Sequence, residues 1–535
     1  MRGSLTATPT ARHKRWLRLP SIPGVNGDCT ITISGLMLIL AGCAVGPDYQ
    51  APQPAVPANF SEPGGTPAST NSMIVPADDW WTVFQDATLN ELMQEAARSA
   101  PDLALADARI REARALRTIA ASDQYPTLDA GGTYNRTHGS ENVPLGVPPG
   151  GLGPGEDGNI WQAGFDASWE IDIFGGLRRK TEAANASYQG EIASRRDVAL
   201  TLFAEIARNY AELRSVQRQL LIIKDELADQ NTLLSLTQSR FNAGLSSRQE
   251  VANDQAGVSA VEAQIPTLVT DEHATIYRIA VLVGRNPEEL LGKLTGPAPV
   301  PEMAPPDVPV GLPSDLLRRR PDISVAERTL AAANARIGVA KADLYPHFYL
   351  TGLAGLESLN FNSFFNAASG YYAVGPGITW KVFDADKIRS EVLAERARTD
   401  QAAVAYQLTV LNALKEVETA LVSYAQAEIR HHSLTNEVAA DQTTLALSSQ
   451  LYDRGVEDYY TVLDARENLD AAEYELAGSE RDTVVSLIAL YKSLGGGWQD
   501  NSRQSPAHMA NLSNGMTASE TNKSNVVTHE TRSIF

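Results

Sequence analysis

The sequence has two cysteines among 535 residues, and aromatic residues make up 7% of the chain. It has no apolar run of the ~20 residues that a transmembrane helix requires. Lys and Arg number 45 against 64 Asp and Glu, which gives a formal net charge of −19. A surface that binds nucleic-acid phosphates needs an excess of cations. The composition therefore argues against a nucleic-acid partner and against membrane-spanning helices.

Catalytic and metal-binding motifs are missing as well. The sequence contains no P-loop, no GxSxG and no HExxH. The eight His are scattered, and the adjacent His431 and His432 lie in a polar helical segment without Cys or acids at zinc spacing. We expect these two side chains to be solvated. The sequence therefore predicts neither an enzyme nor a metal site.

Residues 1–42 have the features of an export signal. The basic stretch RHKRWLRL precedes the apolar run ITISGLMLILAG, which is too short to span a bilayer and ends at Cys43. An ordinary signal peptide followed by an incidental cysteine would share these features. The ending Leu-Ala-Gly-Cys resembles the bacterial lipobox, in which cleavage before the cysteine accompanies acylation of its thiol. Lipid on Cys43 is then the only covalent group expected, and no cofactor is predicted.

The chain contains an internal repeat. Residues 101–128 align with residues 321–348 at an offset of 220, and both segments begin with Pro-Asp and end near Tyr-Pro. Residues 239–251 align with residues 450–462 at an offset of 211. Shared Pro, Trp and Gly positions argue against a chance similarity between Ala-rich helices. The sequence therefore predicts two copies of one structural unit.

The composition of the intervening segments sets the domain boundaries. Pro-rich stretches indicate extended tethers, and a polar tail rich in Asn, Ser and Thr indicates disorder. The predicted order is a signal peptide (1–42), a lipidated Pro-rich tether (43–76), a first repeat (77–295), a Pro-rich linker (296–313), a second repeat (314–498) and a disordered polar tail (499–535).

Each repeat is predicted to follow one order of elements. A helix opens at Pro101 or Pro321 and stops near Tyr-Pro, because the residue before a proline avoids the helical region. Two strands, a very long helix and a returning helix follow, and a glycine suits the left-handed turn between the last two. The predicted strands are 126–136, 159–173, 346–357 and 370–383, with a Gly/Pro-rich loop at 138–158, and the long helices are 181–243 and 387–454.

The strand pattern leaves two interpretations open. NIWQAGFDASWEID, residues 159–172, alternates apolar and polar residues, as does a half-buried soluble sheet or a transmembrane β-barrel. The export signal favours the barrel. Four strands leave two open edges, which hydrocarbon does not tolerate, so a barrel would close between subunits. Two chains would give eight strands and three would give twelve, and eight strands leave almost no lumen.

Four segments together resemble the outer-membrane efflux lipoproteins, which are TolC-like channels of the NodT and OprM type. They are LAGCAVGPDY (40–49), WEIDIFGGLRR (169–179), LLRRRPDISVAERTLAAANARIGVAKADLYPHFYLTG (316–352) and YDRGVEDYYTVLDARENL (452–469). The resemblance implies a mainly α chain with membrane β, in which a homotrimer forms a 12-stranded β-barrel continued by a long periplasmic α-helical barrel. It also implies the outer membrane of a Gram-negative bacterium, a periplasmic adaptor (membrane fusion) protein and an inner-membrane pump of the resistance-nodulation-division class.

The resemblance further places the functional residues at the two helical turns. The turns Ala243-Gly244-Leu245 and Arg454-Gly455-Val456 would dock the adaptor at the periplasmic end. Glu457 and Asp458, beside the second turn, would face the constriction, where three copies of such acids would attract cations. The same acids would also suit the first turn of the returning helix, because carboxylates favour a helix N-terminus. Both interpretations stay open from the sequence.

The leading functional prediction is a passive outer-membrane duct for drugs or other small amphipathic compounds, driven by the inner-membrane pump. The same kind of duct for metal ions or for type I protein secretion is an alternative. A third possibility, of a different class, is an envelope lipoprotein that acts as a coiled-coil scaffold without a pore.

Overall fold

The computed structural model describes residues 44–57, 59–61, 79–142, 155–296 and 313–496. All of them belong to one compact unit that begins at Ala44. Several predicted features lie outside the described residues. These are the signal peptide (1–42), Cys43, the tether beyond residue 61, the middle of the 138–158 loop, nearly all of the linker and the tail (499–535).

The unit is mainly helical, and none of its described helices combines the length and the hydropathy needed to cross a bilayer. The α-helices are α2 (Ala87–Ser99), α3 (Pro101–Ser122), α4 (Gly176–Asn242), α5 (Arg248–Glu262), α6 (Ile265–Val283), α7 (Leu291–Leu294), α8 (Pro313–Arg319), α9 (Pro321–Ala342), α10 (Lys387–Asp453) and α11 (Tyr459–Ser493). Short 3₁₀ turns are η1 (Trp80–Phe84), η2 (Pro287–Leu290), η3 (Phe361–Ser363) and η4 (Ala367–Ser369).

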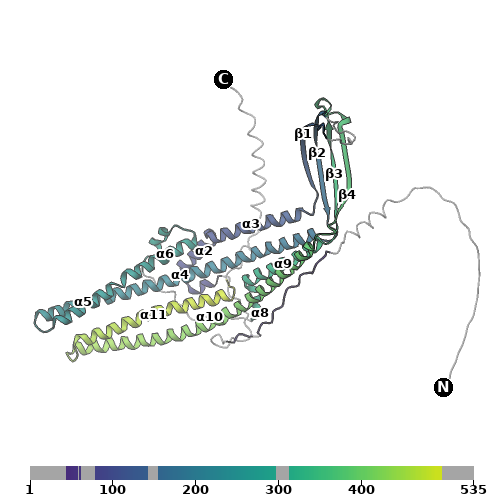
Figure 1. Ribbon diagram of the computed structural model, residues 1–535. Helices are drawn as coiled ribbons and strands as arrows, with labels where there is room; N and C mark the ends of the chain where they lie inside the picture. Colours follow the sequence, from purple (N-terminus) through teal and green to yellow (C-terminus); the bar gives the residue numbers. More distant parts are fainter. Residues whose placement is uncertain (1–43, 58, 62–78, 143–154, 297–312, 497–535) are drawn as a thin grey trace, which may run out of the picture. The chain divides into compact units, whose positions relative to one another are not determined.

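Two very long helices organise the unit, as the sequence predicts. α4 and α10 each have 67 residues, so each extends about 100 Å. Towards the sheet, the helices lie in the order α3, α4, α9, α10. Towards the other end, α5 and α6 lie beside α4, followed by α11 and α10 (Figure 1). One layer of helices therefore has α3, α5 and α6 along one edge and α10 along the other.

The four strands form one antiparallel sheet in chain order. They are β1 (Thr127–His138), β2 (Asp157–Ile171), β3 (His347–Ser358) and β4 (Gly370–Thr379). The pairing of β2 with β3 joins the two repeats, and it sets Trp169 opposite Leu350. β1 and β4 each have one paired side, so they form the two edges of the sheet.

The strand predictions are confirmed to within two residues, except at the end of β4. The expected strand continued to Phe383, but β4 ends at Thr379. His347, the first residue of β3, pairs with Thr379. Because Pro346 precedes His347 and lies in the turn after α9, residues 380–383 have no neighbouring strand to pair with.

The exposure of the sheet decides between the two interpretations of the strand pattern. None of the residues in β1 to β4 is buried. Phe165 is 58% exposed and Tyr372 is 83% exposed. The sheet stands at the end of the helices, and none of the described helices covers either face (Figure 1). A half-buried sheet packed on these helices is therefore excluded.

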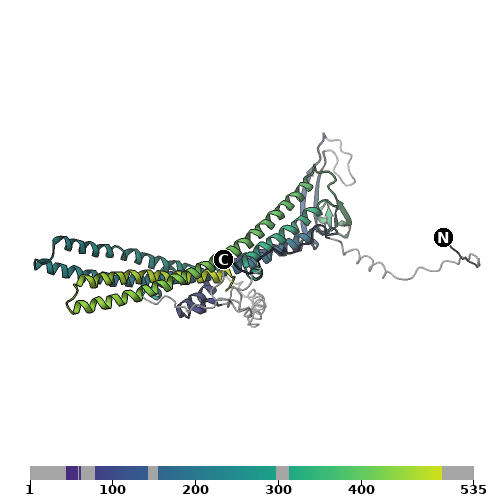
Figure 2. The same ribbon diagram turned by 90° about the horizontal axis from the view of Figure 1, so that it is seen from below.

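The largest core lies among the helices and contains residues of both repeats. Trp80 of η1 is 1% exposed, and its ring stacks on Tyr491 of α11 at 5.4 Å between centroids. Met93 of α2 and Tyr210 of α4 are fully buried in the same cluster. Figure 2 shows α2, in purple, beside the middle of the long helices. The start of the first repeat and the end of the second thus share one core.

The start of α10 contains backbone strain that the start of α4 avoids. Ala385 and Asp386 both have positive φ, 54° and 67°. Asp386 is the residue before α10, whereas the residue before α4 is Gly175, with φ 79°. Only glycine adopts this left-handed region without a steric penalty. The start of α10 therefore forms with a steric cost that the start of α4 does not have.

Ala385→Gly should raise the thermal unfolding midpoint, because it relieves roughly 1 kcal/mol of left-handed strain. The helical circular dichroism signal of the purified protein measures this midpoint. Ala403→Gly, in the exposed middle of α10, is the matched control and should lower the midpoint. A midpoint that falls in both variants would mean that Ala385 is not strained.

Candidate functional site

The predicted turn at Gly244 closes the hairpin of α4 and α5. Gly244 has φ 74°, and its N–H donates to the carbonyl oxygen of Phe241 at 2.9 Å. The N–H of Leu245 donates to the carbonyl oxygen of Arg240 at 2.8 Å. These two bonds satisfy carbonyls that the helix end would otherwise leave free. A Cβ on Gly244 would have no atom within 4 Å, so the backbone angle alone requires glycine.

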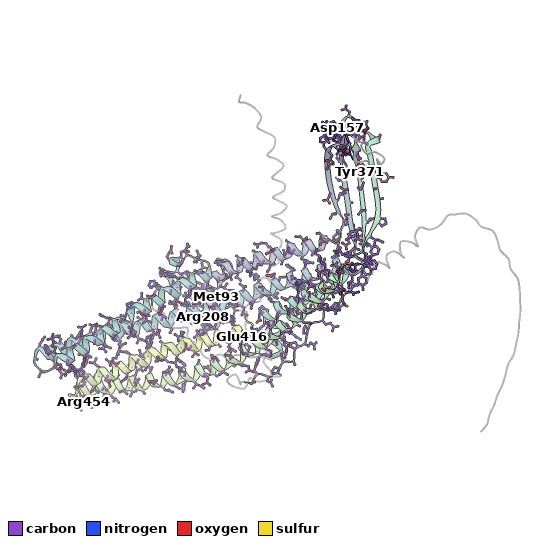
Figure 3. All side chains as sticks on the ribbon, viewed as in Figure 1. Met93, Asp157, Arg208, Tyr371, Glu416 and Arg454 are labelled. Carbon is purple, nitrogen blue, oxygen red and sulfur yellow. The ribbon has the colours of Figure 1, made fainter. Side chains whose placement is uncertain are left out.

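The turn at Gly455 closes the hairpin of α10 and α11 in the same way. Gly455 has φ 72° and donates to the carbonyl oxygen of Tyr452 at 2.8 Å. Val456 donates to the carbonyl oxygen of Leu451 at 3.0 Å. The two turns therefore share one geometry at equivalent positions of the repeat. Arg454 lies at the free end of its hairpin, far from Asp157 at the free end of the β1–β2 hairpin (Figure 3).

Both turns present an apolar side chain to solvent. Leu245 is 72% exposed and Val456 is 69% exposed. In this type of helix end, the residue at that position commonly packs back on the helix. Here the two side chains point away from their own hairpins. The predicted docking role of the residue triplets at 243–245 and 454–456 stays a prediction, and this exposure is compatible with it.

The two candidate gate acids differ in their local bonding. Asp458 is the residue before α11, and its carboxylate accepts from the backbone N–H of Thr461 at 3.3 Å. Its counterpart in the first repeat is Ser247, which caps α5 together with Glu250. Asp458 thus caps α11, as the alternative interpretation expected. Glu457 is exposed, and its carboxylate makes no hydrogen bond or ion pair within the described residues.

Tyr460 joins the two hairpins next to the turns, and sequence reasoning missed it. Its hydroxyl lies 3.1 Å from the hydroxyl of Thr237 on α4. The guanidinium of Arg240 lies 5.6 Å from the centre of the same ring, which is within cation–π range. The tyrosine pair that follows Asp458 has no counterpart in the first repeat. This difference between the repeats is the sequence feature that could have indicated a special role for Tyr460.

The segment from Ala44 to Pro57 is held against the body of the protein. The N–H of Val45 donates to the carbonyl oxygen of Phe174, where β2 gives way to α4, at 2.9 Å. The buried Arg179 binds Asp48 at 2.6 Å and also donates to the carbonyl oxygen of Val45. The residue directly after Cys43 is thus fixed at the junction of sheet and helices.

A cavity of about 680 Å³ opens between α3, α4, α9 and α10. On α9 its lining residues, Arg336, Val339 and Asp343, lie on the side opposite Asn334, which donates to the carbonyl oxygen of Pro47. The lining combines charged side chains of both signs with alanines, Leu116 and Val339. Its charged lining includes Arg109, Glu112, Lys180, Glu191, Arg336 and Glu391.

The family model described as outer membrane efflux protein matches residues 92–285 and 312–496, well over half of the chain. The chain belongs to this family. The first matched segment falls within the first predicted repeat, and the second begins two residues before the second predicted repeat. The prediction of a TolC-like fold and of an outer-membrane efflux channel is confirmed. The family is one of transport channels and not of enzymes.

Individual relatives cover nearly the whole described unit. The chain is 31% identical to the pyoverdine export outer membrane protein OpmQ of Pseudomonas putida over 440 residues, which are 82% of this chain and 92% of OpmQ. It is 29% identical to the cation efflux system protein CusC of Escherichia coli O6:H1 over 478 residues, 88% of this chain and 99% of CusC. The solved outer-membrane channel OprN superposes with a TM-score of 0.77 at 32% identity, over 86% of this chain and 100% of OprN.

Replacing both Glu457 and Asp458 with Ala should raise the resting conductance of the channel in planar bilayers. The physical reason is that Asp458 caps α11, so its loss frees the first turn of this helix beside the constriction that we expect at this end. Asp458→Asn separates charge from capping, because Asn caps a helix about as well as Asp, whereas Asp458→Ala costs about 1 kcal/mol. A current that rises with Ala but not with Asn would assign Asp458 to the cap. An unchanged current in the double variant would remove both acids from the gate.

Proposed function

We propose that three copies of this chain form the exit duct of a tripartite efflux system, which carries small amphipathic compounds through the outer membrane. The observation that carries the proposal is that the sheet and the helical layer of one chain are open along the same two edges. Membership of the efflux channel family supplies the class of protein. The stoichiometry, cargo and partners are proposals that rest on the contacts described below.

The sheet edges require partners because their backbone groups are unpaired. Among the described strands, β1 is hydrogen-bonded only to β2, and β4 only to β3. In hydrocarbon each unsatisfied N–H or C=O costs several kcal/mol, so an open edge is not tolerated. Pairing β4 of one chain with β1 of the next removes both edges. Three chains then give twelve strands, enough to leave a water-filled lumen.

The helical edges carry apolar stripes that no described element covers. The exposed apolar residues of α10 are mostly separated by three, four, seven or eleven residues, each close to a whole number of helical turns. They form one stripe, made of Leu393, Val404, Leu408, Leu411, Val422 and Ile429. α3, at the opposite edge, exposes Leu105, Leu116 and Ile119 by more than half. Contact between α10 and the next chain's α3 would bury the α10 stripe against Leu105 and Ile119, whereas Leu116 lines the cavity between the helices.

The two edges differ from each other, so the contact is head to tail. An interface of this kind closes into a ring when the rotation between neighbours fits. The same rotation would close the sheet into a barrel and the helices into a tube, because α3 leads into β1 and β4 leads towards α10. A scaffold without a pore would leave the sheet uncovered on both faces. The open edges therefore favour the duct.

The cavity supports small amphipathic cargo. On α9 its lining lies opposite the residue that contacts residues 44–57, and we place this side of the layer at the lumen of a closed tube. Arg109 and Arg336 supply positive charge and Glu112 and Glu391 supply negative charge, beside an apolar floor. A compound with an apolar body and a charged group would find both kinds of contact there. Relatives named for pyoverdine and for cations show that cargo varies within the family.

The lipid on Cys43 would anchor the chain at the membrane surface. Ala44 is fixed beside Gly175, at the point where the sheet ends and the helices begin. An acyl group on the preceding residue would enter the leaflet next to the barrel. Since a barrel spans the membrane by itself, the lipid would supplement this attachment.

The proposed partners of the duct follow from the energy that transport requires. A passive duct needs a pump, for which we propose an inner-membrane pump of the resistance-nodulation-division class. A periplasmic adaptor would join the two at the helical turns. Leu245 and Val456 would supply its apolar contacts.

Replacing both Leu408 and Leu411 with Asp should abolish the trimer, because two charges would be buried at the α10 edge. Mass measured by light scattering in detergent reports the oligomer. Asn412→Asp, on the same helix but off the stripe, is the matched control and should remain trimeric. A trimeric double variant would contradict the head-to-tail contact at α10.

Transport itself is tested in cells that lack the gene. Restoring the chain should lower the accumulation of an amphipathic fluorescent dye, and the Leu408 and Leu411 double variant should not. Metal export would be favoured by another outcome, in a chain that still forms trimers and conducts ions. In that outcome the chain relieves copper or silver toxicity and leaves dye accumulation unchanged.

A further inference from the structure

A line of contacts joins the two hairpins from the turns towards the middle of the unit. It runs along α4 and α11 from Ser215, whose hydroxyl donates to the carbonyl oxygen of Ala477 at 3.0 Å, to Thr237 and Tyr460. We call this stretch the α4–α11 seam. Its middle is polar, although it lies between two packed helices. The proposed duct function does not use this region.

The middle of the seam has one cation among five carboxylates. The Nε of Arg466 lies 2.9 Å from a carboxylate oxygen of Asp229 on α4 and 3.4 Å from one of Asp470 on α11. The remaining acids of the group are Glu226, Glu467 and Glu473. Across the same part of the seam, the side-chain amide of Gln230 on α4 donates to the carboxylate of Glu467 on α11.

Asp470 is the least solvated member of the group. It is 4% exposed, and its Oδ2 atom is buried without a hydrogen-bond partner. Burying an ionised carboxylate without full compensation is costly, and the usual relief is to bind a proton. Burial raises the pKa of Asp470 to about 6, with Arg466 opposing the rise and Asp229, Glu226 and Glu473 adding to it.

Neighbouring elements do not supply a compensating charge at Asp470. The adjacent Leu469 and Ala472 contact Val438 of α10, and Arg430 of α10 pairs with Glu475 and Asp482 further along α11. On the other side, α5 meets α4 at Gly257, which lies against Gln230, and Asp254 one turn earlier on α5 has a buried carboxylate oxygen. The largest influences on the pKa of Asp470 come from the groups of α4 and α11 named above.

We propose that the α4–α11 seam is a pH-responsive contact, held firmly when Asp470 is protonated and loosened when Asp470 is ionised. Protonation of Asp470 removes one buried negative charge from a group in which five carboxylates surround a single guanidinium. The ionised form adds repulsion from Asp229 and Glu226 across the seam. The hairpin of α10 and α11 is thus bound to that of α4 and α5 more tightly in an acidic periplasm.

The direction follows from linkage. The pKa of Asp470 is about 6 in the packed seam, and it is 3.8 for the same group in solvent. The stabilisation is therefore complete below pH 3.8 and is lost as the pH rises to about 6. Between pH 5 and pH 8, local opening of the seam should become about tenfold more frequent, mostly below pH 6.5.

Hydrogen exchange of the full-length protein in lipid nanodiscs tests this inference. Protection factors, corrected for the pH dependence of intrinsic exchange, are compared for peptides that cover 462–475 and 224–233. In the wild type they should fall about tenfold from pH 5 to pH 8. In Asp470→Asn they should be independent of pH and at least as high as wild type at pH 8.

Two further variants keep the test specific. Glu437→Gln removes an exposed charge from α10 and should leave the wild-type pH dependence intact. Asp229→Asn removes a carboxylate that repels Asp470, so the fall should move to lower pH. Flat wild-type protection between pH 5 and pH 8, or an unchanged slope in Asp470→Asn, would overturn the inference. Neither result depends on transport, so the duct proposal is tested separately.

Discussion

The unpaired edges of β1 and β4 are the constraint on which the rest of this structure depends. Backbone N–H and C=O groups must be satisfied wherever water is excluded, and a four-stranded sheet cannot satisfy its own edges. None of the strand residues is buried, so the described part of the chain also provides no cover for the faces of the sheet. The proposed ring of three chains would satisfy both edges.

The internal repeat explains how one chain supplies both edges. Each repeat contributes a helix, two strands and a helical hairpin in the same order. The β2–β3 pairing joins the repeats in the sheet, and the core around Trp80 and Tyr491 joins them among the helices. The two ends of this double unit, α3 with β1 and β4 with α10, are unlike surfaces. Unlike ends favour a closed ring over a two-fold dimer.

The two hairpins are joined less uniformly than the rest of the layer. Near the turns, Tyr460 contacts Thr237 and Arg240. Further along, the seam places a buried carboxylate among others of the same sign. Elsewhere the contacts of α4 are largely apolar, as around Ile206 and Leu213. A duct that opens at its periplasmic end needs such weak contacts there, because tightly packed apolar surfaces separate only at a large cost.

The sequence by itself determined the local features. Proline and glycine positions set the helix ends, and the alternation at 159–172 set a strand, because both depend on neighbouring residues alone. The offsets of 220 and 211 indicated two repeats, because a repeat is visible when the sequence is compared with itself. Of the two interpretations that the sequence left open for Asp458, the structure shows the cap on α11. Only the tertiary structure decided that no described helix covers the sheet and that β4 stops at Thr379, where no strand lies beside the next residues. It also brought Tyr460 to Thr237 and Asp470 to Asp229. Those contacts depend on how two helices more than 200 residues apart are rotated against each other, and no short stretch of sequence specifies that rotation.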